Sequence, residues 1–237
     1  CLSQKIESLD RQSLVKLMIG RDEQIIKSDK SVLDQNPIIF RLDRVNTEIG
    51  HNEISFSLKK CEIIGFYGLI GAGRSELAKC IVGNEKITSG EMFLNETVIS
   101  IDSPKTALED YKIGYVSEDR KKEGLILMHN VLDNAGITIW SQISRLFGFL
   151  SDSSITQKVE PFIKKLEVKT PSYDQLVSNL SGGNQQKISV AKWLAAGTDI
   201  LIIDEPTVGI DIKTKSYLHE LIIELSKNGT SIIFISS

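Results

Sequence analysis

The sequence predicts an α/β fold with a mostly parallel sheet, a small antiparallel β subdomain and an α-helical lobe. Residues 62–67 and 200–203 are short apolar runs rich in β-branched residues, typical of strands buried on both faces of a parallel sheet. Apolar residues with helical spacing follow each run, as a strand-then-helix unit requires. Two further helical stretches, 135–150 and 155–166, lie between these units and predict a lobe outside the sheet.

Composition supports one sizeable core and argues against several classes of protein. The chain has 237 residues, 41% of them hydrophobic, which is enough for an α/β core and a smaller lobe. The net charge of −3 comes from interspersed acidic and basic residues, so no broad basic surface favours a nucleic-acid partner. Three cysteines without metal-ligand spacing suit a reducing compartment. Because no apolar run approaches the roughly 20 residues that span a bilayer, we expect any membrane contact to be made through a partner.

The N-terminal region, residues 1–36, is expected to lie outside the core. It begins with helical spacing and continues as a polar stretch with scattered apolar residues, which is typical of a linker. The core is therefore predicted to cover residues 37–237, with the helical lobe at about 119–187.

The core elements follow in chain order. Alternating polar and apolar residues at 53–58 predict a half-buried strand, and 88–101 is typical of an antiparallel hairpin. A short apolar run at 112–116 predicts another buried strand. After the lobe the sequence predicts a helix, a strand, a helix and a strand, at 185–196, 200–203, 213–227 and 231–235.

A glycine-rich loop, GLIGAGRS at 68–75, joins the first buried strand to its helix. It matches the phosphate-loop pattern GxxxxGK[ST] at every fixed position except Arg74, which replaces lysine. The glycines allow backbone N–H groups to turn toward phosphate oxygens, and the positive end of the helix points to the same place. An ordinary glycine-rich turn is the alternative. The residues expected to bind phosphate are Gly68, Leu69, Ile70, Gly71, Ala72, Gly73, Arg74, Ser75 and Glu76.

Arg74 and Ser75 have separate expected roles in this loop. The hydroxyl of Ser75 is the expected ligand of Mg²⁺. Lysine is a compact point charge, whereas arginine is a larger planar fork that keeps the charge but changes its shape. We therefore expect nucleotide binding to be retained and hydrolysis to be slow.

A pair of acidic residues follows the second buried strand, in DEPTVGID at 204–211. Asp204 ends the strand, where its carboxylate would hold Mg²⁺ through water beside the phosphate loop. Glu205 is the expected catalytic base, which orients or deprotonates the attacking water. The alternative is an acidic helix cap without catalytic function. Asp211 is a candidate cap of the following helix.

The segment LSGGNQQK, residues 180–187, precedes a helix. Ser181, Gly182 and Gly183 would present a hydroxyl, backbone N–H groups and a helix N-terminus to a γ-phosphate. The alternative is a simple helix start in which Asn184 is the cap.

The phosphate loop, LSGGNQQK and DEPTVGID occur in the order found in ATP-binding cassette (ABC) ATPases, which the chain resembles over most of its length. The resemblance implies a P-loop ATPase core with a helical signature lobe, and ATP and Mg²⁺ as cofactors. It also implies that two cassettes pair head to tail. Each ATP site then uses the segment of the partner that corresponds to LSGGNQQK, residues 180–187, which is called the signature segment below. The resemblance places Glu118, Gln185 and Asp211 among the candidate nucleotide-binding residues.

A narrower resemblance comes from GLIGAGRSEL, SEDRKKEGL at 117–125 and LSGGNQQK. These segments look like the second cassette of the fused double-cassette ATPases that power bacterial importers of ribose, xylose, arabinose and related sugars. The resemblance implies an ATP-hydrolysing translocase on the cytoplasmic face of the cell membrane. Its partners would be membrane-spanning permease subunits, a first cassette fused on the N-terminal side and, indirectly, a sugar-binding protein. Residues 1–36 would then be the tail of the first cassette and linker, and the cassette at 37–237 would be truncated at its C-terminus.

Four departures from the usual cassette pattern fall on the nucleotide site. Arg74 replaces the lysine, and Glu118 stands where glutamine is usual. Asn46 and Thr47 occupy the region of the usual base-stacking aromatic residue. The switch histidine is either replaced by Ser237, as the resemblance suggests, or absent from this chain. These departures imply a division of labour. This half would bind ATP and hydrolyse it slowly or not at all, while its signature segment completes the site of the first cassette.

The histidines contribute nothing to this interpretation. His51, His129 and His219 lie outside every motif. Imidazole groups are common both in cores and on surfaces, so we expect these three to have ordinary structural roles.

Two other functions stay open. A soluble, non-transport ABC ATPase would be expected to carry a long coiled-coil insertion or a basic face, and the sequence has neither. A nucleotide-binding regulatory module without turnover would agree with the altered phosphate loop. The transported sugar cannot be read from this chain, because the resemblance assigns sugar specificity to other subunits.

Overall fold

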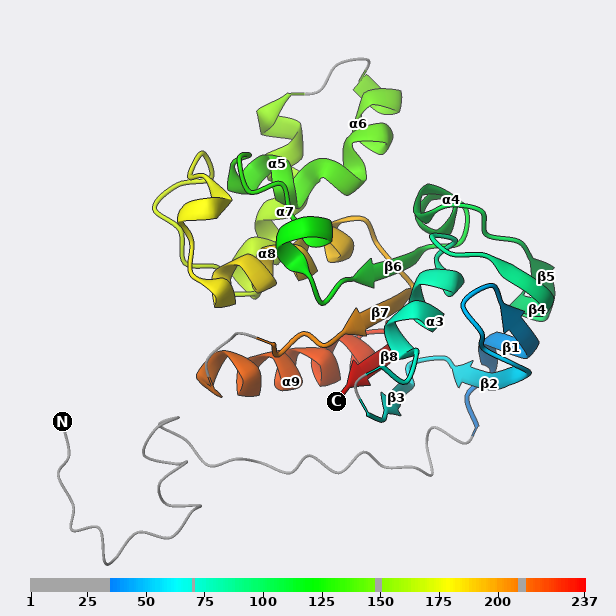
Figure 1. Cartoon of the computed structure of the whole chain (residues 1–237). Helices are drawn as coiled ribbons and strands as arrows, with labels where there is room; N and C mark the ends of the chain where they lie inside the picture. The colour runs from blue at the N-terminus through cyan, green and yellow to red at the C-terminus, as the bar shows by residue number, and fades with distance from the viewer. Residues whose placement is uncertain (1–34, 70, 148–150, 209–211) are drawn as a thin grey trace, which may run out of the picture.

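The computed structural model describes residues 35–69, 71–147, 151–208 and 212–237, and Figure 1 shows their arrangement. Within these residues the strands form two four-stranded sheets, one antiparallel and one parallel, and helices pack around them. The predicted α/β fold is confirmed. The predicted linker lies almost entirely outside the described residues, as do Ile70 and Asp211.

The antiparallel sheet has the strand order β2-β1-β4-β5. Its strands are β1 (Ile38–Thr47), β2 (Ile54–Lys59), β4 (Ile87–Leu94) and β5 (Thr97–Ile99). Strands β4 and β5 form the predicted hairpin, in which Leu94 is paired with Thr97. The turn residues Asn95 and Glu96 both have positive φ, as a tight two-residue hairpin connection requires.

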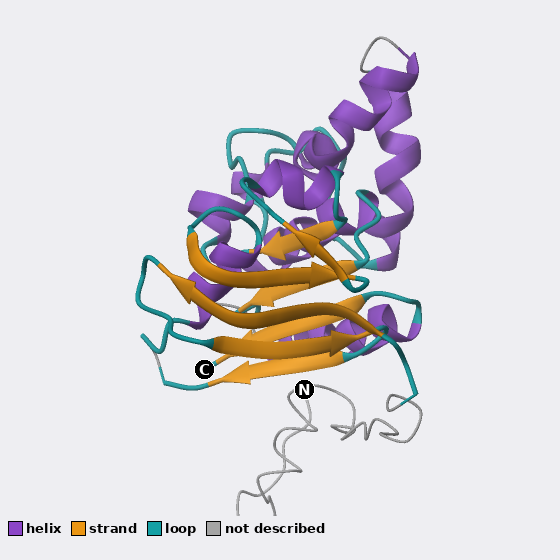
Figure 2. Ribbon diagram, turned by 90° about the vertical axis from the view of Figure 1, so that its right-hand side faces the viewer, coloured by secondary structure: helices purple, strands orange, loops and turns teal. Residues whose placement is uncertain are grey.

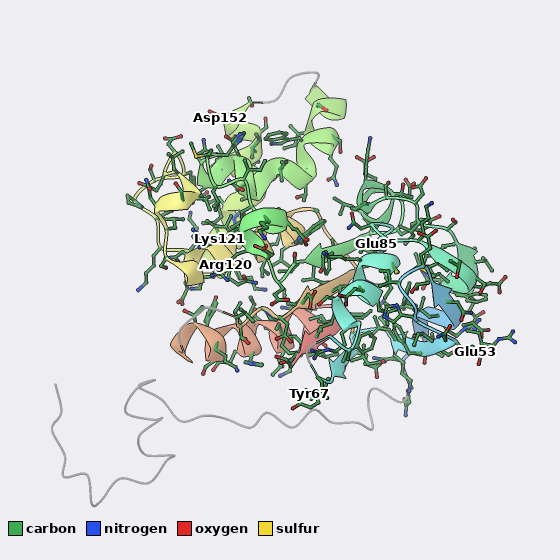
Figure 3. All side chains as sticks on the ribbon, viewed as in Figure 1. Glu53, Tyr67, Glu85, Arg120, Lys121 and Asp152 are labelled. Atoms are coloured by element: carbon green, nitrogen blue, oxygen red, sulfur yellow. The ribbon has the colours of Figure 1, made fainter. Side chains whose placement is uncertain are left out.

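The parallel sheet has the order β3-β8-β7-β6 and contains β3 (Ile63–Tyr67), β6 (Ile113–Val116), β7 (Ile200–Asp204) and β8 (Ser231–Ser236). Every residue of β7 is buried, as its continuous apolar run predicts. The prediction that β3 is buried on both faces is wrong. Among the described residues β3 lies at the edge of the sheet, and Tyr67 is 84% exposed. Figure 3 shows Tyr67 projecting away from the sheets.

Helices α3 (Arg74–Ile81) and α9 (Ile212–Lys227) pack beside the parallel sheet, and the short α4 (Pro104–Glu109) precedes β6. Leu77, Ala78 and Ile81 of α3 join a core cluster that also contains residues of both sheets. Figure 2 shows the strands of the two sheets in successive layers with the helices to one side and above. This packing holds the start of α3 close to the ends of β7 and β8.

The helical lobe consists of α5 (Val131–Gly136), a 3₁₀ turn (Ile137–Ile139), α6 (Trp140–Phe147), α7 (Asp152–Lys165) and α8 (Gly182–Ala195). The single helix predicted at 135–150 is wrong, because helix begins earlier and a 3₁₀ turn interrupts it. The side chain of Asn130 caps α5 by accepting a hydrogen bond from the backbone N–H of Asp133 at 2.7 Å. The lobe has its own core cluster, which includes Val131, Ile139, Ile155, Val159 and Ile188. In the described part of the chain, no helix is long and apolar enough to cross a membrane.

Candidate phosphate-binding site

The glycine loop follows β3 and leads directly into α3 (Figure 1). Gly71 and Gly73 both have φ +82°, a conformation that side chains disfavour. The backbone N–H of Ala72 donates to the carbonyl of Leu69 at 3.1 Å and closes a tight turn. Gly73 is the N-cap of α3 and has no side chain to bond the first N–H groups of that helix. Those donors are therefore suited to bind a phosphate.

Ser75 lies beside Asp204, as the sequence predicts for a magnesium site. The Ser75 hydroxyl donates to Oδ1 of Asp204 at 3.0 Å, and the Tyr115 hydroxyl donates to Oδ2 at 2.8 Å. Asp204 is completely buried. Burial raises the pKa of its carboxyl, while the two hydroxyl hydrogen bonds act in the opposite direction. Mg²⁺ prefers oxygen ligands and takes only one or two from a protein when phosphates supply others, so Ser75 and Asp204 fit this ion.

Tyr115 lies in a predicted strand but was not predicted to be part of the site. Its hydroxyl nevertheless contacts Asp204. Tyr115 comes from β6, which is paired with β7 in parallel register, so its side chain reaches the Asp204 carboxylate at the end of the neighbouring strand. Burial raises the pKa of the Tyr115 hydroxyl, and the charge of Asp204 raises it further. The hydroxyl therefore stays protonated and donates a hydrogen bond to the Asp204 carboxylate.

Arg74 makes contacts that a lysine could not make together. One terminal nitrogen, Nη2, lies 3.8 Å from Oε1 of Glu205 and donates to the carbonyl of Leu69 at 3.3 Å. The other, Nη1, donates to the carbonyl of Ser236 at the end of β8. The planar guanidinium thus joins the phosphate loop, Glu205 and the parallel sheet.

Glu205 is held by its backbone as well as by Arg74. Its N–H donates to the carbonyl of Ile235 at 3.1 Å, and its φ is +41°, which is unusual for a non-glycine residue. Such strained conformations are frequent at functional sites. The Glu205 carboxylate therefore has a fixed position beside a cation.

Glu118 follows β6 and lies within the electrostatic influence of the same acidic group. Burial raises the pKa of Glu118, and the negative charges of Asp204 and Glu205 raise it further, while Arg74 opposes them. The expected role of Glu118 in nucleotide binding stays a prediction.

A second polar cluster joins α3 to the segment after β6. Lys79 donates to Oε1 of Glu123 at 2.8 Å, and the hydroxyl of Ser117 donates to Oε2 at 2.6 Å. The hydrogen bond from Lys79 lowers the pKa of Glu123 most strongly. Glu123 belongs to a short π-helix, Arg120–Gly124, and such turns are frequent at functional sites. Sequence reasoning missed this cluster, although SEDRKKEGL contains Ser117 and Glu123.

Arg120 connects this π-helix to the loop after Glu205. Its Nη1 donates to the carbonyl of Val208 at 3.0 Å. Figure 3 shows Arg120 and Lys121 between the lobe and the parallel sheet. The segment after β6 is therefore in contact with both α3 and the loop that follows β7.

The signature segment lies in the lobe, whereas the phosphate loop lies between β3 and α3, beside the end of β8 (Figure 1). Ser181 is the N-cap of α8, since its hydroxyl oxygen accepts from the N–H of Asn184 at 3.4 Å. The alternative with Asn184 as the cap is wrong, because its Oδ1 accepts from the N–H of Lys169 at 2.9 Å. Gly183 faces Thr214 of α9, where an added Cβ would lie 2.9 Å from the Thr214 Oγ1. The segment thus requires a small residue at this contact with α9.

Gln185 is not brought to the other candidate residues. Its side chain is buried and its Nε2 donates to the carbonyls of Val177 at 3.0 Å and Leu180 at 3.2 Å. It therefore stabilises the turn before α8.

The three histidines differ in their surroundings. His129 is exposed, with Nδ1 3.7 Å from Asp133, and the ring of His219 packs against Phe234. His51 is half-buried, and its Nε2 lies 2.8 Å from the carbonyl oxygen of Gly73 in the phosphate loop. This contact is compatible with the structural role expected of a histidine outside the motifs.

Comparison with known protein families gives one clear match. Residues 51–208 match the family described as ABC transporter. The ribose import ATP-binding protein RbsA of Clostridium tetani (strain Massachusetts / E88) is 40% identical over 98% of this chain and 46% of its own length. That of Caldanaerobacter subterraneus subsp. tengcongensis is 40% identical over 98% of this chain and 47% of its own length. The chain thus spans about half the length of the curated relatives it matches.

Solved structures show the same fold at lower identity. A nucleotide-free ATP-binding cassette from an ABC transporter aligns with a TM-score of 0.70 at 19% identity, covering 85% of this chain and 82% of that one. A dimeric ATP-binding cassette in a post-hydrolysis state with ADP and Pi aligns with a TM-score of 0.69 at 23% identity, covering 84% and 88%.

Proposed function

The chain belongs to the ABC transporter family, and from this membership we propose that it is an ATP-binding cassette of a sugar importer. ATP binding and hydrolysis would be coupled to uptake of a monosaccharide across the cytoplasmic membrane. The observation that carries the proposal is the contact between Ser75, at the start of α3, and the buried Asp204, at the end of β7. A hydroxyl beside a carboxylate at this place suits Mg²⁺ with a nucleoside triphosphate.

The chain's residues would divide the work at this site as follows. Backbone N–H groups at the start of α3 would bind phosphate oxygens, and Ser75 and Asp204 would hold Mg²⁺. Glu205 would orient the attacking water and accept its proton. Bound Mg-ATP supplies the phosphoanhydride bond whose hydrolysis releases the free energy for transport.

The pairing of Arg74 with Glu205 supports slow hydrolysis at this site. The Glu205 carboxylate is paired with the guanidinium, so it would have to leave this partner to reach an attacking water. Arg74 also bonds to Leu69 and Ser236, so moving it toward a phosphate would break these hydrogen bonds. We therefore assign the degenerate nucleotide site to this cassette.

The signature segment would serve a different ATP site. The oxygen of Ser181 accepts a hydrogen bond from the start of its own helix, which leaves its proton free to donate to a phosphate oxygen. Because this segment lies apart from the phosphate loop, its phosphate would belong to a second cassette. The natural candidate is a first cassette fused on the N-terminal side, since the curated relatives are about twice as long as this chain.

The domain organisation and location follow from the same proposal. Residues 1–36 would be the tail of the first cassette and linker, and 37–237 the second cassette, with its helical lobe at about 119–187. Membrane-spanning permease subunits would bind the cassette on the cytoplasmic face, and a sugar-binding protein would act with them on the other side. Similarity to ribose import ATP-binding proteins favours ribose or a related sugar.

A regulatory nucleotide-binding module without turnover is the second candidate, and the Arg74–Glu205 pair favours it too. Phosphate release from the full-length protein, compared with its Glu205→Gln variant, separates the two. If this site hydrolyses ATP slowly, the variant loses a small but measurable part of the turnover. An identical rate in both proteins would support the regulatory module.

A further inference from the structure

The turn between β1 and β2 is closed by hydrogen bonds between its first and last residues. The N–H of Thr47 donates to the carbonyl of His51 at 3.1 Å, and the N–H of His51 donates to the Thr47 hydroxyl oxygen at 3.2 Å. The N–H of Gly50 donates to the carbonyl of Thr47 at 3.2 Å. Thr47, the last residue of β1, is only 6% exposed. Because this residue is buried, it fixes the start of the turn against the body of the protein.

The imidazole of His51 connects this turn to the phosphate loop. Nδ1 lies 2.8 Å from the Thr47 hydroxyl oxygen, and Nε2 lies 2.8 Å from the Gly73 carbonyl oxygen. A carbonyl only accepts hydrogen bonds, so Nε2 carries a proton. The Thr47 hydroxyl accepts from the His51 N–H and has its own proton to donate to Nδ1. Both ring nitrogens are therefore satisfied in a single tautomer, which fixes the ring.

The Gly73 carbonyl receives a second hydrogen bond from its own helix. The N–H of Leu77 donates to it at 2.9 Å, so both lone pairs of this oxygen are used. The ring also occupies the place of a side chain at position 73, where an added Cβ would lie 2.5 Å from the His51 Nε2. Two observations therefore favour glycine at position 73: its φ is positive, and the His51 ring fills the space that a Cβ would take.

From these contacts we propose that His51 is a positioning residue for the phosphate loop. Its Nε2–H donates to the Gly73 carbonyl. This hydrogen bond keeps the carbonyl directed toward the β1–β2 turn and toward the N–H of Leu77 in α3. The N–H groups of Arg74 and Ser75, which follow Gly73, then stay at the open end of the helix, where a phosphate can accept from them. His51 acts through Gly73 and makes no contact with the nucleotide. The inference rests on the proposed function only where it concerns nucleotide affinity.

Two substitutions separate the contact with Gly73 from the contact with Thr47. In His51→Gln the side-chain amide nitrogen reaches about as far as Nε2 and can donate to the Gly73 carbonyl. In His51→Asn the shorter amide reaches only as far as Nδ1, so it keeps a partner in Thr47 and loses Gly73. His129→Ala is the matched control, since it removes an exposed imidazole far from the loop.

The first measurement is amide hydrogen exchange of the peptide covering residues 68–76 in the full-length protein without nucleotide. We expect exchange about fivefold faster in His51→Asn and near the wild-type rate in His51→Gln and His129→Ala, as loss of one hydrogen bond predicts. The second is the concentration dependence of 8-azido-ATP photolabelling, mapped to peptides of this cassette. We expect half-saturation to shift about fivefold upward in His51→Asn only.

The two measurements distinguish failure of the inference from failure of the proposed function. Equal exchange in His51→Asn and His51→Gln overturns the positioning role, whatever the labelling shows. Faster exchange in His51→Asn alone supports the role. If no variant or wild-type protein is labelled in this cassette, nucleotide binding is wrong, while the exchange result still decides whether His51 positions the loop.

Discussion

The guanidinium Nη2 of Arg74 lies 3.8 Å from the carboxylate of Glu205, and the two side chains are only 13% and 9% exposed. This pair joins the altered position of the phosphate loop to the residue expected to act as the base. The position where arginine replaces lysine is therefore in ionic contact with the proposed base. Under the proposed function, this cassette would keep its phosphate-binding backbone and its signature segment while its proposed base is paired with a cation.

Substitution of Ser181 should reduce sugar uptake much more than substitution of Arg74. Ser181→Ala removes the hydroxyl that we propose for a second ATP site, whereas Arg74→Ala alters a site that we propose to contribute little turnover. We expect uptake by the full transporter to fall at least tenfold in the first variant and less than threefold in the second. Uptake of labelled sugar into proteoliposomes measures both.

Ser181 is also a helix cap, so this comparison needs a control for stability. Ser151→Ala removes the corresponding cap of α7, where the hydroxyl oxygen accepts from the N–H of Ser154 at 3.3 Å. Each change should cost about 1 kcal/mol of stability. Equal loss of uptake in the Ser181 and Ser151 variants would mean that capping alone explains the effect, and equal loss in the Ser181 and Arg74 variants would contradict the division of labour.

Asp204→Asn should make the protein more stable and less able to bind Mg-ATP. Burial raises the pKa of the Asp204 carboxyl, so its ionised form destabilises the folded state, and stability falls as pH rises through the raised pKa. Removing the charge should increase the free energy of unfolding at pH 7 by about 1 kcal/mol, or roughly 2–4 °C in Tm. Thermal unfolding and Mg²⁺-dependent nucleotide binding measure the two effects. A lower Tm in the variant would show that the hydrogen bonds from Ser75 and Tyr115 outweigh the burial of the charge.

Because of Lys192, the free energy of unfolding should increase at alkaline pH. This lysine of α8 is 8% exposed and donates to the carbonyl of Gly124, and burial lowers its pKa to about 8. The folded state therefore disfavours the charged amine, and stability rises between about pH 8 and the pKa of lysine in the unfolded chain, roughly 10.4.

The test of Lys192 compares the wild-type protein with Lys192→Met by urea unfolding between pH 7 and pH 10. Methionine keeps an unbranched apolar chain of similar length without the charge. We expect the variant to be about 1–3 kcal/mol more stable at pH 7 and to lose this part of the pH dependence. Unchanged dependence on pH would assign the effect to other groups.

Local patterns predicted the residues that lie within one strand-loop-helix unit. The apolar runs of β3 and β7, the glycine loop and the acidic pair each occupy a few consecutive residues, and a strand's period and a helix's start determine where they lie. The contact between Ser75 and Asp204 agrees with the rule that parallel strands of one sheet end at the same edge, although β8 lies between β3 and β7.

Apart from the contact between Ser75 and Asp204, contacts between distant segments were not predicted, because they depend on strand order and register. Tyr115 reaches Asp204 only because β6 is paired with β7, and His51 reaches Gly73 only because the β1–β2 turn lies beside α3. The exposure of Tyr67 has the same origin, since β3 is at the edge of the sheet among the described residues. Pairwise side-chain contacts of this kind leave no periodic pattern in the sequence.

The most direct test of the central claim is ATP hydrolysis by the Arg74→Lys variant of the full-length protein. Lysine restores the usual point charge of a phosphate loop and cannot bond Leu69, Ser236 and Glu205 together, so Glu205 is released to act as a base. Arg44→Lys is the control, because Arg44 is exposed and its guanidinium is paired with its neighbour Asp43. We predict that phosphate release at saturating ATP rises up to about twofold in Arg74→Lys, as a second competent site would add, and is unchanged in Arg44→Lys. A rate in Arg74→Lys equal to or below that of the wild-type protein would contradict the account.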